Sequence, residues 1–183
     1  MITVRVAKDV PYLRNGKHYQ AISTAVLATR RPDFRLVHFS IQRNHLHFIV
    51  EADATGALSR GMRAVGIRIA RRLNHAAGRT GRVIADRYHI LPLTCPTAVR
   101  RGIHYVLANA RRHNPAATER LGPRWVDPFS SAPHFDGWYT FERPATHLAL
   151  GPPVTVAPTI WLLTTGWRLR GLLLPWAVPG RRF

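Results

Sequence analysis

The sequence predicts an α+β fold: a ferredoxin-like split βαβ unit with an antiparallel sheet, followed by an irregular Pro/Trp-rich C-terminal extension. Up to about residue 115, β-forming and helix-period runs alternate in the order β-α-β-β-α-β-α. Two of the expected strands are separated only by "RN", which suits a tight antiparallel hairpin. Beyond residue 116 the periodicity ends, so we expect a catalytic-type domain over 1–115 and a wrapping segment or tail over 116–183.

The first half of the domain contains three expected strands and one helix. Residues 1–7, "MITVRVA", alternate β-forming side chains and predict the first strand. Residues 17–31 have apolar side chains at helical spacing, and Pro32 follows as a stop signal. The β-rich runs on either side of "RN" predict strands at about 34–41 and 44–52.

A long amphipathic helix is expected next, over residues 55–78. Gly78 suits its C-terminal end. Arginines occupy the side opposite the apolar stripe, except that Ile67 sits among them. At 100° per residue, the apolar stripe consists of Leu58, Met62, Val65, Ile69 and Leu73.

The remaining elements are a fourth strand, a last helix and the extension. "RVIADRYHILPL", residues 82–93, predicts the strand. The helix is expected over 95–113, with Pro96 near its start and Asn114-Pro115 at its end. The extension contains one short amphipathic element over 159–173 and all five tryptophans, which indicate docking onto the domain or a partner.

The chain is strongly basic, with a formal net charge of +18. Lys8 and Lys17 are its only lysines, and 25 of the 27 basic residues are arginine, whose planar fork fits phosphate oxygens. This balance favours a nucleic-acid partner. The single cysteine, Cys95, and the lack of a signal-peptide core or an uninterrupted apolar span predict a cytoplasmic protein without a membrane partner.

The two histidines of "NHLHFIV" are the first candidate for chemistry. On a strand, His45 and His47 point to the same face, roughly 6.5–7 Å apart along the backbone. Two imidazoles at this spacing can bind one ion from one side, but a third ligand must come from elsewhere. Two solvated histidines are the alternative interpretation, and the motif alone favours that alternative.

The last helix offers the missing groups. Tyr105 lies on its polar face, within about 40° of Asn109, Arg101 and Arg112, and opposite the apolar residues. This face carries a phenol nucleophile, an amide oxygen and phosphate-binding cations. A half-buried tyrosine at the edge of the apolar stripe is the structural alternative.

Together these motifs resemble the single-tyrosine HUH transposases, and most closely the bacterial REP-associated tyrosine transposases. The histidine motif matches at His45-Leu46-His47, and the helix motif, Tyr followed four residues later by Asn or Gln, matches at Tyr105 and Asn109. The resemblance covers roughly residues 1 to 115. The order and spacing of the two motifs are more specific than either motif alone.

The resemblance implies a mechanism on single-stranded or hairpin DNA. His45, His47 and Asn109 would bind one Mg²⁺ or Mn²⁺ ion. Tyr105 would attack a phosphodiester, giving a 5′-phosphotyrosine and a free 3′-OH. The protein would therefore be a DNA transposase and single-strand endonuclease, acting as a monomer or a homodimer.

Further residues have less specific roles. We expect Tyr88 to be a weaker candidate nucleophile and His38 to lie near the metal site. His75, His89, His104 and His113 match no motif and are interpreted as surface or packing residues. DNA contacts are expected from Arg60, Arg63, Arg68, Arg71, Arg101 and Arg112.

Two other functions fit the sequence. A DNA-binding protein of the same ancestry that no longer cleaves would need the same fold and charge. An RNA-binding ferredoxin-like domain would instead carry exposed aromatic side chains on its sheet, where this chain has histidines.

Overall fold

Four antiparallel strands form one sheet in the order β2-β3-β1-β4. They are β1 (Ile2–Arg5), β2 (Phe34–Ile41), β3 (His45–Ala52) and β4 (His89–Ile90). This computed structural model of the chain describes residues 1–113, 122–139 and 152–180. Because β3 lies between β1 and β2, the sheet has the ferredoxin-like split βαβ arrangement, and the predicted fold class is confirmed.

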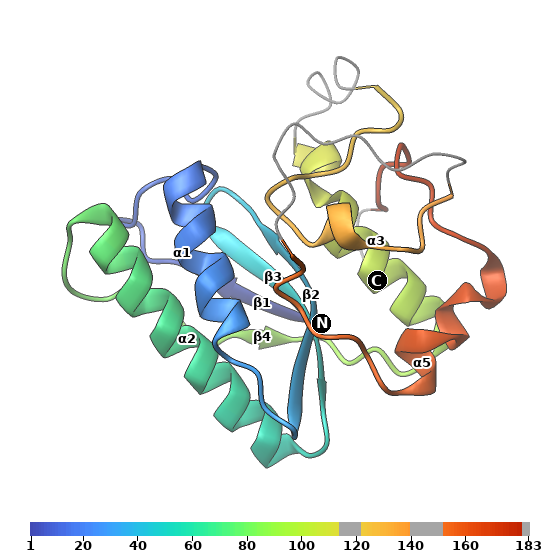
Figure 1. Cartoon of the computed structure of the whole chain (residues 1–183), viewed down its shortest axis with the longest axis horizontal. Coiled ribbons are helices and arrows are strands. Elements are labelled where there is room, and N and C mark those ends of the chain that lie inside the picture. Colours follow the sequence, from blue (N-terminus) through green and yellow to red (C-terminus); the bar gives the residue numbers. More distant parts are fainter. Residues whose placement is uncertain (114–121, 140–151, 181–183) are drawn as a thin grey trace.

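Two helices cover one face of the sheet, α1 (Gly16–Leu27) and α2 (Thr55–Ala77) (Figure 1). The side chain of Asn15 caps α1 by accepting a hydrogen bond from the His18 amide, and Gly78 ends α2 with φ of 61°. Most of the expected apolar stripe of α2 is buried against α1 and the sheet. The first hydrophobic core therefore lies between these helices and one face of the sheet.

The other face of the sheet is covered by α3 (Pro96–His113) and by the described parts of the extension (Figure 1). The extension contains three short helical elements, which are η1 (Ala132–His134), α5 (Trp161–Thr164) and η2 (Gly166–Arg170). Trp125, Trp138 and Trp167 are buried, the latter two in the core that α3 forms with this face. The extension thus completes a second core and buries α3 on most of its sides.

The extension also covers the edge strand β2. Backbone amides of Ser131 and Val156 donate to β2 carbonyls at 3.0 Å, and the Ile41 amide donates to the Phe129 carbonyl at 2.8 Å. These bonds satisfy backbone groups that an open edge would leave unpaired. The described segments of the extension are therefore held to the sheet by strand-like pairing as well as by packing.

Two buried carboxylates tie the extension to the domain. Asp127 receives a bidentate ion pair from Arg14 at 2.8 Å. Glu51, on β3, accepts hydrogen bonds from the Thr159 hydroxyl and from the Thr159 amide at 2.9 Å, and it pairs with Arg35. Because both carboxylates are almost fully buried, they depend on these partners.

Some expected bounds are wrong. The fourth strand spans only two residues, because the chain leaves the sheet after an isolated bridge between Val6 and Ile84, and the polar residues Asp86 and Arg87 are exposed. The first helix ends at Leu27, four residues earlier than expected. The expected helix end at Asn114-Pro115, and the boundary at 115–116, lie outside the described residues.

Two glycines of α2 should respond oppositely to alanine. A Cβ at Gly61 would lie 2.3 Å from the ring of Phe34, whereas a Cβ at Gly66 would meet nothing within 4 Å. We expect Gly61→Ala to lower the free energy of unfolding by about 1–3 kcal/mol through overpacking. Gly66→Ala should raise it by up to about 1 kcal/mol through helix propensity. Urea denaturation measures both, and a shift in the same direction for both variants would contradict this packing.

Candidate active site

The alternation of β3 directs His45 and His47 toward the face that α3 covers. Leu46 and Phe48 point the other way, into the core with α1 and α2. The neighbouring strand β1 pairs Thr3 with His47 and Arg5 with His45. The centre of the sheet therefore presents two histidines, a hydroxyl and a guanidinium to α3.

The two imidazoles face each other through their Nε2 atoms, which lie 3.1 Å apart. The Nδ1 atom of each ring has its own partner. His47 Nδ1 lies 3.0 Å from Thr3 Oγ1, and His45 Nδ1 lies 3.0 Å from Asn44 Oδ1. These partners fix the orientation of both rings, so that the two Nε2 atoms converge on one point.

Helix α3 places two aromatic side chains of one face against this histidine pair. The Tyr105 ring lies 5.1 Å from the His47 ring, and the His113 ring lies 6.1 Å from the His45 ring. Asn109 is midway between Tyr105 and His113 on this face, because residues four apart lie one above the other. Tyr105 is therefore in ring contact with the histidine pair, and Asn109, on the same face of α3, remains a predicted ligand.

Asn109 is fully buried, and neither its amide nitrogen nor its amide oxygen has a hydrogen-bond partner among the described residues. Leaving a buried polar group without a partner typically costs about 1–3 kcal/mol. Such a cost is expected where a side chain is kept for a ligand rather than for stability.

The residues present fit a divalent ion on two counts. Two ligands at right angles on an octahedral ion, with bonds of about 2.1 Å, lie about 3.0 Å apart, close to the Nε2 separation. Asn109 supplies an unpartnered amide oxygen. Among the residues that the structure describes, no group of three or more His, Cys, Asp or Glu side chains could hold a metal, so the fit needs the amide.

Burial keeps both histidines neutral. It lowers the pKa of His45 to about 4, with smaller contributions from His113 and Arg5. It lowers the pKa of His47 to about 3, with smaller contributions from His45 and His113. A neutral imidazole is the form that binds a metal ion.

A cation lies over the tyrosine ring. The Arg112 guanidinium lies 5.7 Å from the centre of the Tyr105 ring and also donates to the Gly180 carbonyl. Tyr105 is half-buried and packs against the second core. A phosphate placed here would therefore be stabilised by positive charge.

We compared this chain with known proteins. No protein-family model matches the chain, and neither does any curated protein. A solved structure of the REP-associated tyrosine transposase bound to a REP hairpin matches with a TM-score of 0.53 and 17% sequence identity. The match covers 87% of this chain and 91% of that chain.

The chain has the fold of a REP-associated tyrosine transposase. The match includes most of this chain, so it extends beyond the βαβ unit into the extension. The resemblance that the two motifs indicated is confirmed at the level of the fold.

Within this transposase fold, the arginines expected to bind DNA fall into two groups. Arg101 and Arg112 are on α3, the helix that carries Tyr105. The other four are exposed on α2, in the helical layer across the sheet from the histidine pair, where Arg60 forms an ion pair with Asp33. The α2 group consists of Arg60, Arg63, Arg68 and Arg71.

The structure places two of the other histidines. His113 is exposed and its ring packs against His45, which agrees with its interpretation as a surface or packing residue and also brings it next to the candidate site. Its spacing of eight residues from Tyr105 could have placed it on the same face. His38 was expected near the metal site, but its ring packs against Phe135, 5.3 Å away, with Nδ1 3.4 Å from Ser131 Oγ.

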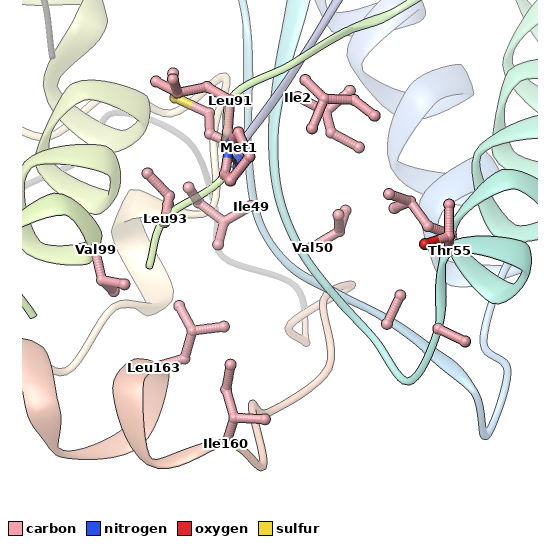
Figure 2. A pocket seen from close by; sticks show the side chains of 15 residues that line it. Met1, Ile2, Ile49, Val50, Thr55, Leu91, Leu93, Val99, Ile160 and Leu163 are labelled. Atoms are coloured by element: carbon pink, nitrogen blue, oxygen red, sulfur yellow. Dashed lines mark hydrogen bonds between the residues drawn. The ribbon is translucent and has the colours of Figure 1, made fainter. Parts of the chain in front are cut away.

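An apolar cavity of about 340 Å³ lies further along β3, between α5 and the start of the chain (Figure 2). Ile49, Leu93, Val99 and Leu163 point into it from separate elements. Its lining is mostly hydrocarbon and lacks the convergent nitrogens of the histidine pair. The candidate active site is therefore the histidine pair with α3, and the cavity is a gap between core layers.

The lowered pKa values of the pair make stability depend on pH. An unfolded histidine has a pKa of about 6.5, so below that pH the unfolded chain binds protons that the folded chain does not. Without metal, we expect the free energy of unfolding to fall as pH drops from about 6.5 toward 4. From pH 7 to pH 5, each imidazole should lower the free energy of unfolding by about 1 kcal/mol, after allowance for solvent screening.

The measurement is urea denaturation at both pH values with a chelator present. The double variant His45→Asn/His47→Asn should lose much of the pH dependence. His75→Asn, which changes an exposed histidine of α2, should keep it. Equal pH dependence in the double variant and the wild type would contradict a buried neutral pair.

Proposed function

We propose that the protein is a metal-dependent, transposase-like endonuclease and strand transferase that acts on single-stranded or hairpin DNA through Tyr105. The observation that carries the proposal is the packing of Tyr105, 5.1 Å ring to ring, on a histidine pair whose Nε2 atoms converge. The unpartnered amide of Asn109, one turn further along the same helix, supports it. The transposase fold supports it, because the matching protein was solved bound to a REP hairpin.

Tyr105 supplies the nucleophile. Its phenol oxygen gives up its proton and forms a bond to phosphorus while the bond from phosphorus to the 3′-oxygen breaks, and the leaving 3′-oxygen takes up a proton to become a hydroxyl. The product is a 5′-phosphotyrosine, whose ester bond a 3′-hydroxyl can attack in the reverse direction to join strands. The Arg112 guanidinium lies over the ring, where it can pair with the negative charge of the attacked phosphate.

His45, His47 and Asn109 would hold one Mg²⁺ or Mn²⁺ ion. When bound, the ion neutralises charge on the phosphate and orients it for in-line attack. Two imidazoles make Mn²⁺ at least as suitable as Mg²⁺, which prefers oxygen ligands. Thr3 and Asn44 orient the rings, and Asn109 would complete the set from α3, one turn after Tyr105.

DNA binding follows from charge. The chain has a net charge of +18, and α2 presents exposed arginines along one side. Successive arginines of this group are three to five residues apart, a rise of about 4.5–7.5 Å on a helix, so they can contact neighbouring phosphates along a strand. We propose that the α2 arginines hold a duplex stem and that Arg101 and Arg112 guide the single strand to Tyr105.

Replacing the phenol oxygen tests the nucleophile. A labelled single-stranded hairpin DNA incubated with the protein and Mn²⁺ should yield a covalent protein–DNA adduct. We expect Tyr105→Phe to abolish this adduct, because the substitution removes only the attacking oxygen. Denaturing gel electrophoresis measures the adduct. Tyr88→Phe is the matched control and should form it at the wild-type level.

Three outcomes would overturn parts of the proposal. Adduct formation by Tyr105→Phe would exclude this nucleophile. Loss of the adduct in Tyr88→Phe alone would assign the chemistry to Tyr88. Tight, salt-sensitive DNA binding without cleavage under any divalent metal would favour a non-cleaving DNA-binding protein of the same ancestry.

A further inference from the structure

We propose that Thr3 is a positioning residue for the metal ion, because its hydroxyl lets His47 change which ring nitrogen carries the proton. The inference rests on the proposed function and adds a residue that neither sequence motif contains. Thr3 Oγ1 lies 3.0 Å from His47 Nδ1 and contacts no other atom of the histidine pair by a hydrogen bond in the described structure. Thr3 therefore acts on the ion through His47.

Asn44 determines the protonation of the neighbouring ring. Its Oδ1 atom, which can only accept, lies 3.0 Å from His45 Nδ1. With the Asn44 amide in this orientation, His45 Nδ1 carries the proton. In a neutral imidazole the other nitrogen then has a lone pair, so His45 Nε2 is an acceptor.

Without an ion, His47 must donate a hydrogen bond to the lone pair of His45 Nε2. Two lone pairs would repel at the Nε2 separation of 3.1 Å, so His47 Nε2 carries the proton and donates it to His45 Nε2. His47 Nδ1 then has the lone pair. Thr3 satisfies it by donating its hydroxyl hydrogen.

When an ion binds, His47 must adopt the opposite tautomer. Both Nε2 lone pairs have to point at the ion, so the His47 proton moves from Nε2 to Nδ1 of the same ring, with no net change in protons. Thr3 Oγ1 then has to accept the Nδ1–H bond. Among side chains of this size only a hydroxyl can both donate and accept, whereas valine can do neither.

The strand register places a hydroxyl side chain on each side of His47, and only Thr3 has a hydrogen bond to its ring in the described structure. β1 pairs Thr3 with His47 on one side, and β2 pairs Ser40 with His47 on the other. The Ser40 hydroxyl accepts a hydrogen bond from Gln42 Nε2 at 3.3 Å. Thr3 is half-buried, so its bond to His47 is partly shielded from water.

Metal affinity tests the inference without DNA or turnover. Mn²⁺ binding to the full chain is measured by the loss of the free-ion electron paramagnetic resonance signal. We expect Thr3→Val to weaken binding about 10- to 100-fold, the range typical when a partner behind a ligating histidine is removed. Thr3→Ser keeps the hydroxyl and should bind within about threefold of the wild type.

The controls separate this role from folding and from the metal site itself. Valine suits a strand, so Thr3→Val should fold. Thr24→Val makes the same change at a half-buried threonine of α1 and should bind as the wild type does. His47→Ala should abolish Mn²⁺ binding. The difference between this variant and the wild type is the binding that belongs to the histidine site.

A second readout follows the His47 proton directly. Nitrogen-15 NMR of the histidine rings, with Mg²⁺ as the titrant, should show the His47 proton on Nε2 without the ion and on Nδ1 with it. Equal Mn²⁺ affinity for Thr3→Val and the wild type, with binding lost in His47→Ala, would overturn the role of Thr3 alone. Wild-type binding that survives His47→Ala would overturn the metal site and with it this inference.

Discussion

The packing of α3 across the second face of the sheet is the constraint on which the candidate site depends. β3 presents two histidines, but histidines on an open sheet face would be solvated and their rings free to rotate. Laying α3 over them buries the pair, brings the Tyr105 ring to 5.1 Å from His47, and places Asn109 where water no longer satisfies its amide. One helix–sheet contact thus carries both the proposed nucleophile and the proposed ion ligands.

The extension makes that contact stable. A helix with an unpartnered buried amide would gain from moving away from the sheet, and the described parts of the extension oppose this by covering the outer side of α3. Trp138 and Trp167 are buried beside it, and Glu51 and Asp127 tie the extension to β3 and to Arg14. Glu51 is on the same face of β3 as His47, so one strand carries both the candidate ligands and an anchor of the segment that covers them.

Local patterns predicted much of this arrangement. The β3 alternation and the helical spacing of Tyr105 and Asn109 depend only on the period of the backbone. The burial of Asn109 could not be predicted in this way, because it depends on the packing of α3 against the sheet. The helical pattern alone assigns Asn109 to a polar face. Thr3 was missed because its relation to His47 comes from strand register. The expected fourth strand is longer than the observed one. Its β-forming residues lie on both sides of Asp86 and Arg87, which remain exposed.

The shift in unfolding midpoint on adding Mn²⁺, compared between the wild type and Asn109→Leu, tests most directly whether the buried amide is kept for an ion. An ion that binds only the folded chain stabilises it by mass action. We expect the ion to raise the wild-type midpoint and to leave that of Asn109→Leu unchanged, although the variant is at least as stable as the wild type without metal. An equal rise in both proteins, or a metal-free variant less stable than the wild type, would contradict a site built around Asn109.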